Sequence, residues 1–261
     1  MSKQPNFVFA ELRQQELLSL INKERRVVVS DLCERFGVSP VTIRKDLTEL
    51  EKLGHIKRVY GGAIRLQDSS SMELTSQEKT GLHAAQKRSI AQLAHRYLEP
   101  GKIIAIDSGT TTMELAKTLV DVPDMTILTN DLKIALFLEK NTSHTLIFLG
   151  GTVRKNFHCT AGNMALDILD SLHVDTFFLA TNAINLEWGL STPNVEMANV
   201  KSKIMKNSMR TILLADSSKF GSASMVRFAT INQIDTLITD NHADPAFLAA
   251  VQAMDVEICT G

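Results

Sequence analysis

Short apolar runs alternate with helical patterns from residue 102 to the end of this 261-residue chain, and this alternation restricts the fold more than any other feature. Six runs have the length of buried strands, and several are rich in β-branched residues: 102–106, 125–128, 145–149, 176–180, 211–215 and 236–238. Helical spacing of apolar residues occurs between several of them, at 113–119, 132–139, 197–209 and 245–254. Because strands that alternate with helices build a parallel sheet with covering helices, the sequence predicts an α/β domain with a mostly parallel sheet.

A second, smaller domain precedes this one. Residues 78–97 have helical spacing, whereas the Ser-rich stretch 67–77 has no apolar period and predicts a flexible connector. We therefore expect a first domain over 10–66, a connector over 67–77 and a larger domain over 78–261. The chain has 44% hydrophobic and 22% charged residues, a globular composition that excludes an intrinsically disordered protein.

Several classes of protein and site are excluded by what the sequence lacks. No apolar run approaches the roughly 18 residues of a membrane span, and the first residues lack the apolar stretch of a secretory signal, so we expect a cytoplasmic protein. Three widely spaced cysteines do not indicate a disulfide framework. We expect no metal, because His158 and Cys159 lack a second pair of ligands. We also expect no cofactor, because neither a Walker A nor a dinucleotide-binding motif is present.

The net charge of −1 conceals two segments of opposite sign. Residues 1–66 carry 12 Lys and Arg against 8 Asp and Glu, a net +4, and the remaining 16 basic and 21 acidic residues give −5. A small positive segment on a larger negative body is typical of a module that meets a polyanion.

The positive segment has the pattern of three short helices. Apolar residues at helical spacing predict a first helix over 11–23. A second helix is predicted to begin at Ser30, whose hydroxyl caps the first turn, and to end at Gly37. A third is predicted to begin with Ser39 as N-cap and Pro40 at the first helical position.

The third helix, which Gly54 ends, has the properties of a recognition helix. Its polar faces can donate hydrogen bonds to phosphates and base edges, and a helix-turn-helix places this helix in the major groove. The stretch 55–66 alternates apolar and basic residues around two glycines, which predicts a β-hairpin wing. The predicted DNA-binding residues are Ser39, Thr42, Arg44, Lys45, Thr48, Lys57, Arg58 and Arg65. The alternative is a small helical domain for protein contact.

The phrase VSPVTIRKDLTELEKLG at 38–54, followed by KRVYGGA at 57–63, resembles the N-terminal signature of the DeoR/GlpR family of bacterial transcriptional regulators. The resemblance covers nearly the whole chain from about Arg13 and, at 107–112 and 189–192, is greatest for the amino-sugar, galactosamine-type branch. It implies a winged helix-turn-helix followed by a phosphosugar-sensing domain whose fold is similar to sugar-phosphate isomerases and CoA-transferases. The implied partners are double-stranded operator DNA, a phosphorylated sugar and further copies of the chain in a homodimer or homotetramer.

One segment after the first strand has the chemistry of a phosphate site: Asp107, Ser108, Gly109, Thr110, Thr111 and Thr112. Glycine lets the backbone approach a ligand closely, and hydroxyl groups add donors. The free N–H groups of the first helical turn and the helix dipole favour an anion at this position. The alternative is a simple strand-to-helix turn with capping hydroxyls.

Other strand ends supply further polar groups to the same edge of the predicted sheet. Lys219 supplies a point charge for a phosphate, and Asp107 or Asp216 can accept from sugar hydroxyls. The resemblance implies that further residues line the effector site with them: Thr129, Asn130, Gly150, Gly151, Glu196, Lys201 and the loop 216–219. For Glu196 and Lys201 a solvated helix pair is the alternative. The segment 180–184 departs from the G-V-D-G-like turn of many relatives, so their sugar specificity is not transferred.

Two functions follow from these features. The first is a regulator, by resemblance a repressor of a sugar-utilisation operon, whose DNA affinity changes when a phosphorylated sugar binds. The second is a sugar-phosphate isomerase with a DNA-binding appendage, for which Asp107, Asp216 and Glu196 are candidate bases. We favour the regulator and expect no enzyme, because no constellation of residues is specific for catalysis.

Overall fold

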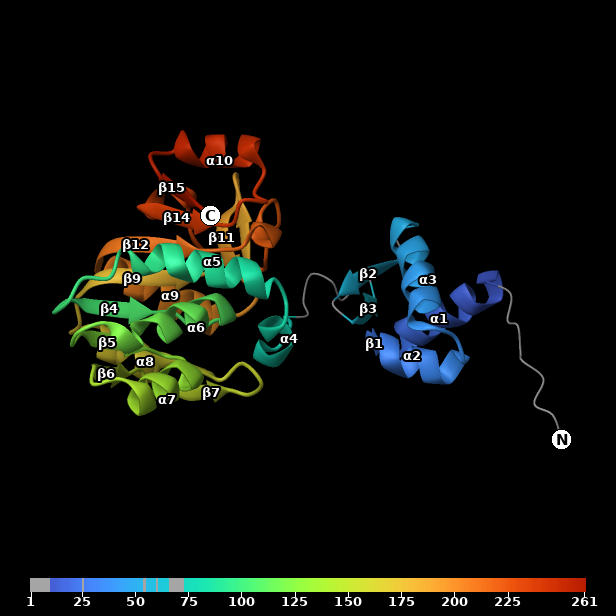
Figure 1. Cartoon of the computed structure of the whole chain (residues 1–261), viewed down its shortest axis with the longest axis horizontal. Helices are drawn as coiled ribbons and strands as arrows, with labels where there is room; N and C mark the ends of the chain where they lie inside the picture. Colours follow the sequence, from blue (N-terminus) through green and yellow to red (C-terminus); the bar gives the residue numbers. More distant parts are fainter. Residues whose placement is uncertain (1–9, 25, 54, 60, 66–72) are drawn as a thin grey trace. The chain divides into compact units, whose positions relative to one another are not determined.

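The computed structural model describes residues 10–24, 26–53, 55–59, 61–65 and 73–261, apart from the side chains of Glu11, Arg26 and Arg65. The chain divides into two compact units, Met1–Met72 and Glu73–Gly261. We call them the winged-helix unit and the α/β unit (Figure 1). Residues 67–72 of the expected connector lie outside the described residues, whereas Glu73–Gln77 differ from that expectation and belong to the α/β unit.

The winged-helix unit packs three helices against a small antiparallel sheet. Its elements are α1 (Ala10–Glu24), β1 (Arg26–Val28), α2 (Val29–Phe36), α3 (Pro40–Lys52), β2 (Ile56–Val59) and β3 (Gly62–Arg65), with the strand order β1-β3-β2. Buried side chains from all three helices and the sheet form one core, including Leu17, Ile21, Leu32, Leu47 and Ile56. Both the three helices and the hairpin are therefore confirmed, and β1 is an additional strand that the sequence pattern did not indicate.

The ends of the helices show which sequence signals were correct. Ser39 caps α3 by accepting from the Thr42 N–H at 3.2 Å, with Pro40 in the first turn, as predicted. Gly37 ends α2 with a left-handed φ of 64°, also as predicted. The predicted Ser30 cap is wrong: α2 begins one residue earlier. The Val29 N–H instead donates to the Gly61 carbonyl at 2.6 Å, so the hairpin turn satisfies the start of the helix.

The α/β unit is built on a seven-stranded, all-parallel sheet with the order β15-β14-β12-β9-β4-β5-β6. The strands are β4 (Ile103–Ile106), β5 (Thr126–Thr129), β6 (Thr145–Phe148), β9 (Val174–Ala180), β12 (Ser208–Leu214), β14 (Thr236–Thr239) and β15 (Glu257–Thr260). All six predicted strands are confirmed. The direction of strand progression reverses between β4 and β9, and the loops beyond such a reversal frame a crevice in open α/β sheets.

Helices cover both faces of this sheet (Figure 1). Helices α5 (Ala84–His95), α6 (Thr110–Lys117) and α7 (Leu132–Asn141) contribute to one apolar cluster with Ile104 and Ile106 of β4. Helices α8 (Asn163–Leu169), α9 (Val195–Lys206) and α10 (Pro245–Gln252) contribute to a second cluster with Ala105 of β4. Successive residues of a strand point to opposite faces, so β4 supplies both clusters.

Smaller elements complete the unit. They are the helix α4 (Ser76–Thr80), the hairpin β7 (Thr152–Arg154) and β8 (Cys159–Ala161), the three-stranded sheet β10 (Ala183–Asn185), β11 (Gly189–Thr192) and β13 (Val226–Ala229), and the 3-10 turns Thr118–Asp121, Ser217–Lys219 and Ile231–Gln233. The single helix expected over 78–97 is two helices, because His83 has a left-handed φ of 52° between α4 and α5. Among the residues that the structure describes, no helix is both long and apolar enough to span a membrane.

Candidate functional site

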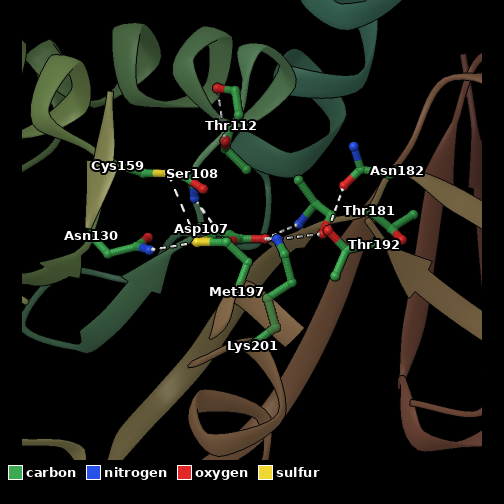
Figure 2. A network of polar contacts seen from close by, with 12 residues as sticks. Asp107, Ser108, Thr112, Asn130, Cys159, Thr181, Asn182, Thr192, Met197 and Lys201 are labelled. Carbon is green, nitrogen blue, oxygen red and sulfur yellow. Dashed lines mark hydrogen bonds and ion pairs between the residues drawn. The ribbon is translucent and has the colours of Figure 1, made fainter. Parts of the chain in front are cut away.

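The loop after β4 is anchored by a buried carboxylate. Asp107 has no exposed surface, and its two oxygens accept from the Ser108 N–H at 2.8 Å and the Ala180 N–H at 2.9 Å. The Lys201 ammonium also donates to Asp107, as Figure 2 shows. Asp107 therefore joins β4, the end of β9 and α9 at one point, and it holds the loop rather than facing a ligand.

Lys201 completes this anchor. It is 3% exposed, and its ammonium also donates to the Ala180 carbonyl at 3.0 Å. The alternative of a solvated helix pair is thus wrong for Lys201, whereas Glu196 is exposed and does not contact the site. Lys201 is the residue of this pair that lines the cavity described below.

The start of α6 presents backbone donors that have no acceptor within the helix. Gly109 is its N-cap and provides no side-chain hydrogen bond, and Thr112 directs its hydroxyl back to the Gly109 carbonyl at 3.0 Å. The N–H groups of the first helical turn lack intrahelical acceptors, and the helix dipole favours a negative charge beside them. The first turn of α6 therefore has the donors that an anion requires.

A cavity of about 110 Å³ lies against this turn. Ser108, Gly109, Thr110 and Thr111 of the predicted phosphate loop line it. The charged lining consists of five cations and two carboxylates: Lys79, Lys87, Arg154, Lys201, Lys219, Glu73 and Asp216. This excess of positive charge favours an anionic ligand, and the predicted loop, Lys201, Asp216 and Lys219 come together around it.

Lys87 is a buried cation that other cations of this lining repel. It is 4% exposed and donates to the Lys79 carbonyl at 2.7 Å. The pKa of Lys87 is lowered to about 8, mainly by burial; repulsion from Lys219 and Lys79 contributes to this shift, and the attraction of Asp216 and Glu114 opposes it. A bound anion would relieve this repulsion.

Asp216 supplies an acceptor at the same cavity. It is 1% exposed, and one oxygen accepts from the backbone N–H and the hydroxyl of Ser218. Its other oxygen, Oδ2, has no hydrogen-bond partner among the residues that the structure describes. A buried acceptor without a donor is costly, so a ligand hydroxyl at this oxygen would be favourable.

Several predicted site residues do not line this cavity: Asp107, Thr112, Thr129, Asn130, Gly150, Gly151 and Glu196. Thr129 accepts from the Asp131 N–H at 3.1 Å, and Asn130 donates to the Thr160 carbonyl at 2.9 Å. Gly151 lies where a Cβ would be 2.6 Å from the Ala161 carbonyl oxygen. Asn130 and Gly151 thus contact the second strand of the β7–β8 hairpin and do not face the cavity.

Sequence reasoning missed part of the lining: Glu73, Lys79, Lys87, Arg154, Asn182 and Thr192. Asn182 lies in the departing segment 180–184, and its amide oxygen accepts from the Thr192 hydroxyl at 2.9 Å. The departure at the end of β9 was a signal for Asn182, and the resemblance at 189–192 was a signal for Thr192. Glu73, Lys79, Lys87 and Arg154 do not follow strands of the main sheet, so their positions were not indicated.

The predicted DNA-binding residues gather on α3 and the wing. Ser39, Arg44, Lys45 and Lys57 are exposed, and Thr42, Thr48 and Arg58 are half-buried. The guanidinium of Arg58 donates to the Thr48 hydroxyl at 2.9 Å, which joins the wing to α3. The side chain of Arg65 lies outside the described residues.

A buried ion pair fixes α3 within the unit. The Arg13 guanidinium of α1 donates to both oxygens of Asp46 on α3, at 2.6 and 3.1 Å. Asp46 is 3% exposed, so this bidentate contact is well shielded from water. The exposed face of α3 is thereby held in one orientation relative to α1.

Together the two units define a class of protein that carries a winged helix-turn-helix and a separate α/β unit with a cationic cavity. Residues 13–69 match the DeoR-like helix-turn-helix domain, and residues 82–241 match the DeoR C terminal sensor domain. The chain belongs to the DeoR family of helix-turn-helix transcriptional regulators, which confirms the resemblance seen in the sequence.

Similar proteins include the "Putative aga operon transcriptional repressor" of Escherichia coli O157:H7, which is 34% identical over 94% of this chain and 92% of the relative. The HTH-type transcriptional regulator GlpR of Haloferax volcanii is 32% identical over 95% of this chain and 97% of the relative. A ribose-5-phosphate isomerase structure in complex with phospho-erythronic acid has a TM-score of 0.40 and 14% identity, over 52% of this chain and 54% of that chain. The family assignment makes this chain a transcriptional regulator, and the alternative of an isomerase is discarded.

Proposed function

We propose that this regulator binds operator DNA through α3 and the wing and that a phosphorylated sugar in the α/β cavity changes its DNA affinity. The observation that carries the proposal is the cationic cavity at the first turn of α6. Backbone N–H groups and lysine ammonium groups there suit a phosphate, and the free oxygen of Asp216 suits a sugar hydroxyl.

The DNA-binding half of the proposal rests on the exposed cations of the winged-helix unit. Arg44 and Lys45 extend from α3, and Lys57 extends from the wing. A helix-turn-helix protein with paired heads reads two half-sites, so we propose an even-numbered assembly, a homodimer or a homotetramer.

Linkage sets the condition for this control, and a relative indicates its direction. A ligand changes DNA affinity only when it binds the two DNA-affinity states unequally. The relative from E. coli O157:H7 carries the name of an operon repressor. We therefore propose that this chain is also a repressor and that the sugar phosphate lowers its affinity for the operator.

Lys219→Ala tests the ligand half of the proposal. The variant removes a half-buried cation from the cavity, so binding of the most effective member of a panel of phosphorylated sugars should weaken about fivefold to tenfold. Calorimetric titration measures the change, with DNA affinity in the absence of sugar expected to stay the same. Lys140→Ala removes an equal charge from an exposed position on α7 and serves as the control. Equal sugar affinity in both variants would place the ligand elsewhere.

The pH dependence of binding provides a second test. Because the pKa of Lys87 is lowered to about 8, its positive charge is present at pH 7 and lost as the pH rises to 9. A phosphate monoester stays a dianion over this range, so its affinity should fall between pH 7 and 9. In Lys87→Arg the charge persists, and the fall should be smaller. The same pH profile in both proteins would show that Lys87 does not face the ligand.

A further inference from the structure

The cavity contains a carboxylate of its own. Glu73, the first residue of the α/β unit, accepts from the Lys79 ammonium at 2.9 Å and from the Arg154 guanidinium at 2.9 Å. The Asn182 amide also donates to it, at 3.0 Å. The Glu73 side chain is 11% exposed. Two of the five cations of the lining, Lys79 and Arg154, thus already donate to a carboxylate of the chain itself.

Glu73 also borders a second space. A cavity of about 50 Å³ is lined by Glu73, Lys79 and Arg154 together with Ser108, Gly109 and Thr110 of the phosphate loop. The same six residues line the larger cavity. Both spaces therefore meet the first turn of α6, and the Glu73 side chain is part of the wall of each.

A carboxylate and a phosphate compete for the same donors. Lys79 and Arg154 can donate to either, but a phosphate monoester carries more charge and three acceptor oxygens. Burial raises the pKa of Glu73, and the Lys79 charge with the hydrogen bonds from Lys79, Arg154 and Asn182 lowers it by more. Glu73 therefore stays ionised at neutral pH and remains a strong hydrogen-bond acceptor for Lys79 and Arg154.

We propose that Glu73 is a built-in competitor of the effector, which holds Lys79 and Arg154 in the unliganded protein and is displaced when a phosphate binds them. This inference rests on the proposed function and states how the ligand distinguishes two states of the protein. Glu73 follows residues 66–72, through which the sequence connects to the winged-helix unit, and these lie outside the described residues. The displaced group is thus at the position of the α/β unit nearest in sequence to the DNA-binding unit.

Two variants of Glu73 separate competition from a structural role. In the full chain, Glu73→Gln should bind inorganic phosphate and the panel of phosphorylated sugars on the order of tenfold tighter, as expected if Glu73 leaves its donors in about a tenth of molecules. Glu73→Asp keeps the charge but is too short to hold both cations, so its affinity should lie between wild type and Glu73→Gln. Glu139→Gln, an exposed charge loss on α7, should match wild type.

The order of affinities decides the outcome. If wild type binds most tightly and Glu73→Gln least, Glu73 only positions its cations and the inference is overturned. If Glu73→Asp equals wild type, simple charge repulsion explains the result and displacement is again overturned. Melting temperatures confirm that each variant is folded, and Glu73→Asp alone suffices should Glu73→Gln unfold.

Hydrogen exchange tests the displacement itself. Amides of residues 73–80 in the wild-type chain should exchange faster when inorganic phosphate saturates the cavity, because their anchor is released. Slower exchange would contradict the inference. If no protein in the series binds phosphate or any sugar phosphate, the proposed effector class fails and the inference fails with it. If phosphate binds but the affinities of wild type, Glu73→Asp and Glu73→Gln do not follow the expected order, the inference fails and the proposed function stands.

Discussion

Replacing Asp107 with Asn is expected to lower the free energy of unfolding by about 3–5 kcal/mol at pH 7. Both carboxylate oxygens accept hydrogen bonds in a site with no exposure, and Lys201 beside them is 3% exposed. The variant keeps the shape but turns an amide NH2 group toward donors and leaves a buried ammonium without its counter-charge. Urea unfolding followed by circular dichroism measures the loss.

A double-mutant cycle identifies the cause of that loss. Lys201→Met removes the opposite charge, and the double variant Asp107→Asn with Lys201→Met should be less destabilised than the sum of the two single variants. Additive effects would show that the two side chains contribute independently. A loss below about 1 kcal/mol for Asp107→Asn would mean that water reaches this pair despite its burial.

Arg44→Ala is expected to cost about 1–3 kcal/mol of specific DNA binding if Arg44 donates to a guanine in the major groove. Arg44 is exposed on α3 and contributes little to the core of its unit, so the melting temperature should not change. Genomic fragments enriched by the wild-type protein supply the operator, and binding is measured at two salt concentrations. Loss of a base contact relaxes specificity at one position, whereas loss of a phosphate contact weakens binding to all sequences alike.

Arg96→Ala is the matched control for this measurement. It removes the same charge from an exposed position of the α/β unit. Operator affinity of the Arg44→Ala protein equal to that of Arg96→Ala would exclude Arg44 from the recognition surface.

Local patterns predicted most elements of the fold. The strand from 103 to 106 is wholly apolar because helices cover both of its faces, which made it visible in the sequence. β15 was missed because it lies at the edge of the sheet, where only Ile258 and Cys259 are apolar and both are half-buried. The Ser30 cap failed because β1 and the Gly61 carbonyl determine where α2 begins, and this contact joins residues far apart in the sequence.

The candidate site was only partly predictable for the same reason. The phosphate loop could be identified because its glycine and hydroxyl residues are consecutive. The role of Asp107 was misread as ligand contact, since its partner Lys201 is 94 positions further along the chain. Glu73 was assigned to a connector because its Ser-rich surroundings have no apolar period, yet its three donors come from α4, β7 and the end of β9.

The residues beside the reversal of strand order between β4 and β9 form two groups: those that hold the scaffold and those that line the cavity. The floor beneath the cavity is fixed by main-chain groups of Ala180 and by the Asp107 and Lys201 pair. The rim is supplied by Lys79, Arg154 and Asn182, none of which belongs to the seven-stranded sheet. Under the proposed function, substitutions at the rim can therefore change which phosphorylated sugar binds while the scaffold stays intact, so the same fold can acquire a new effector without a change in its core.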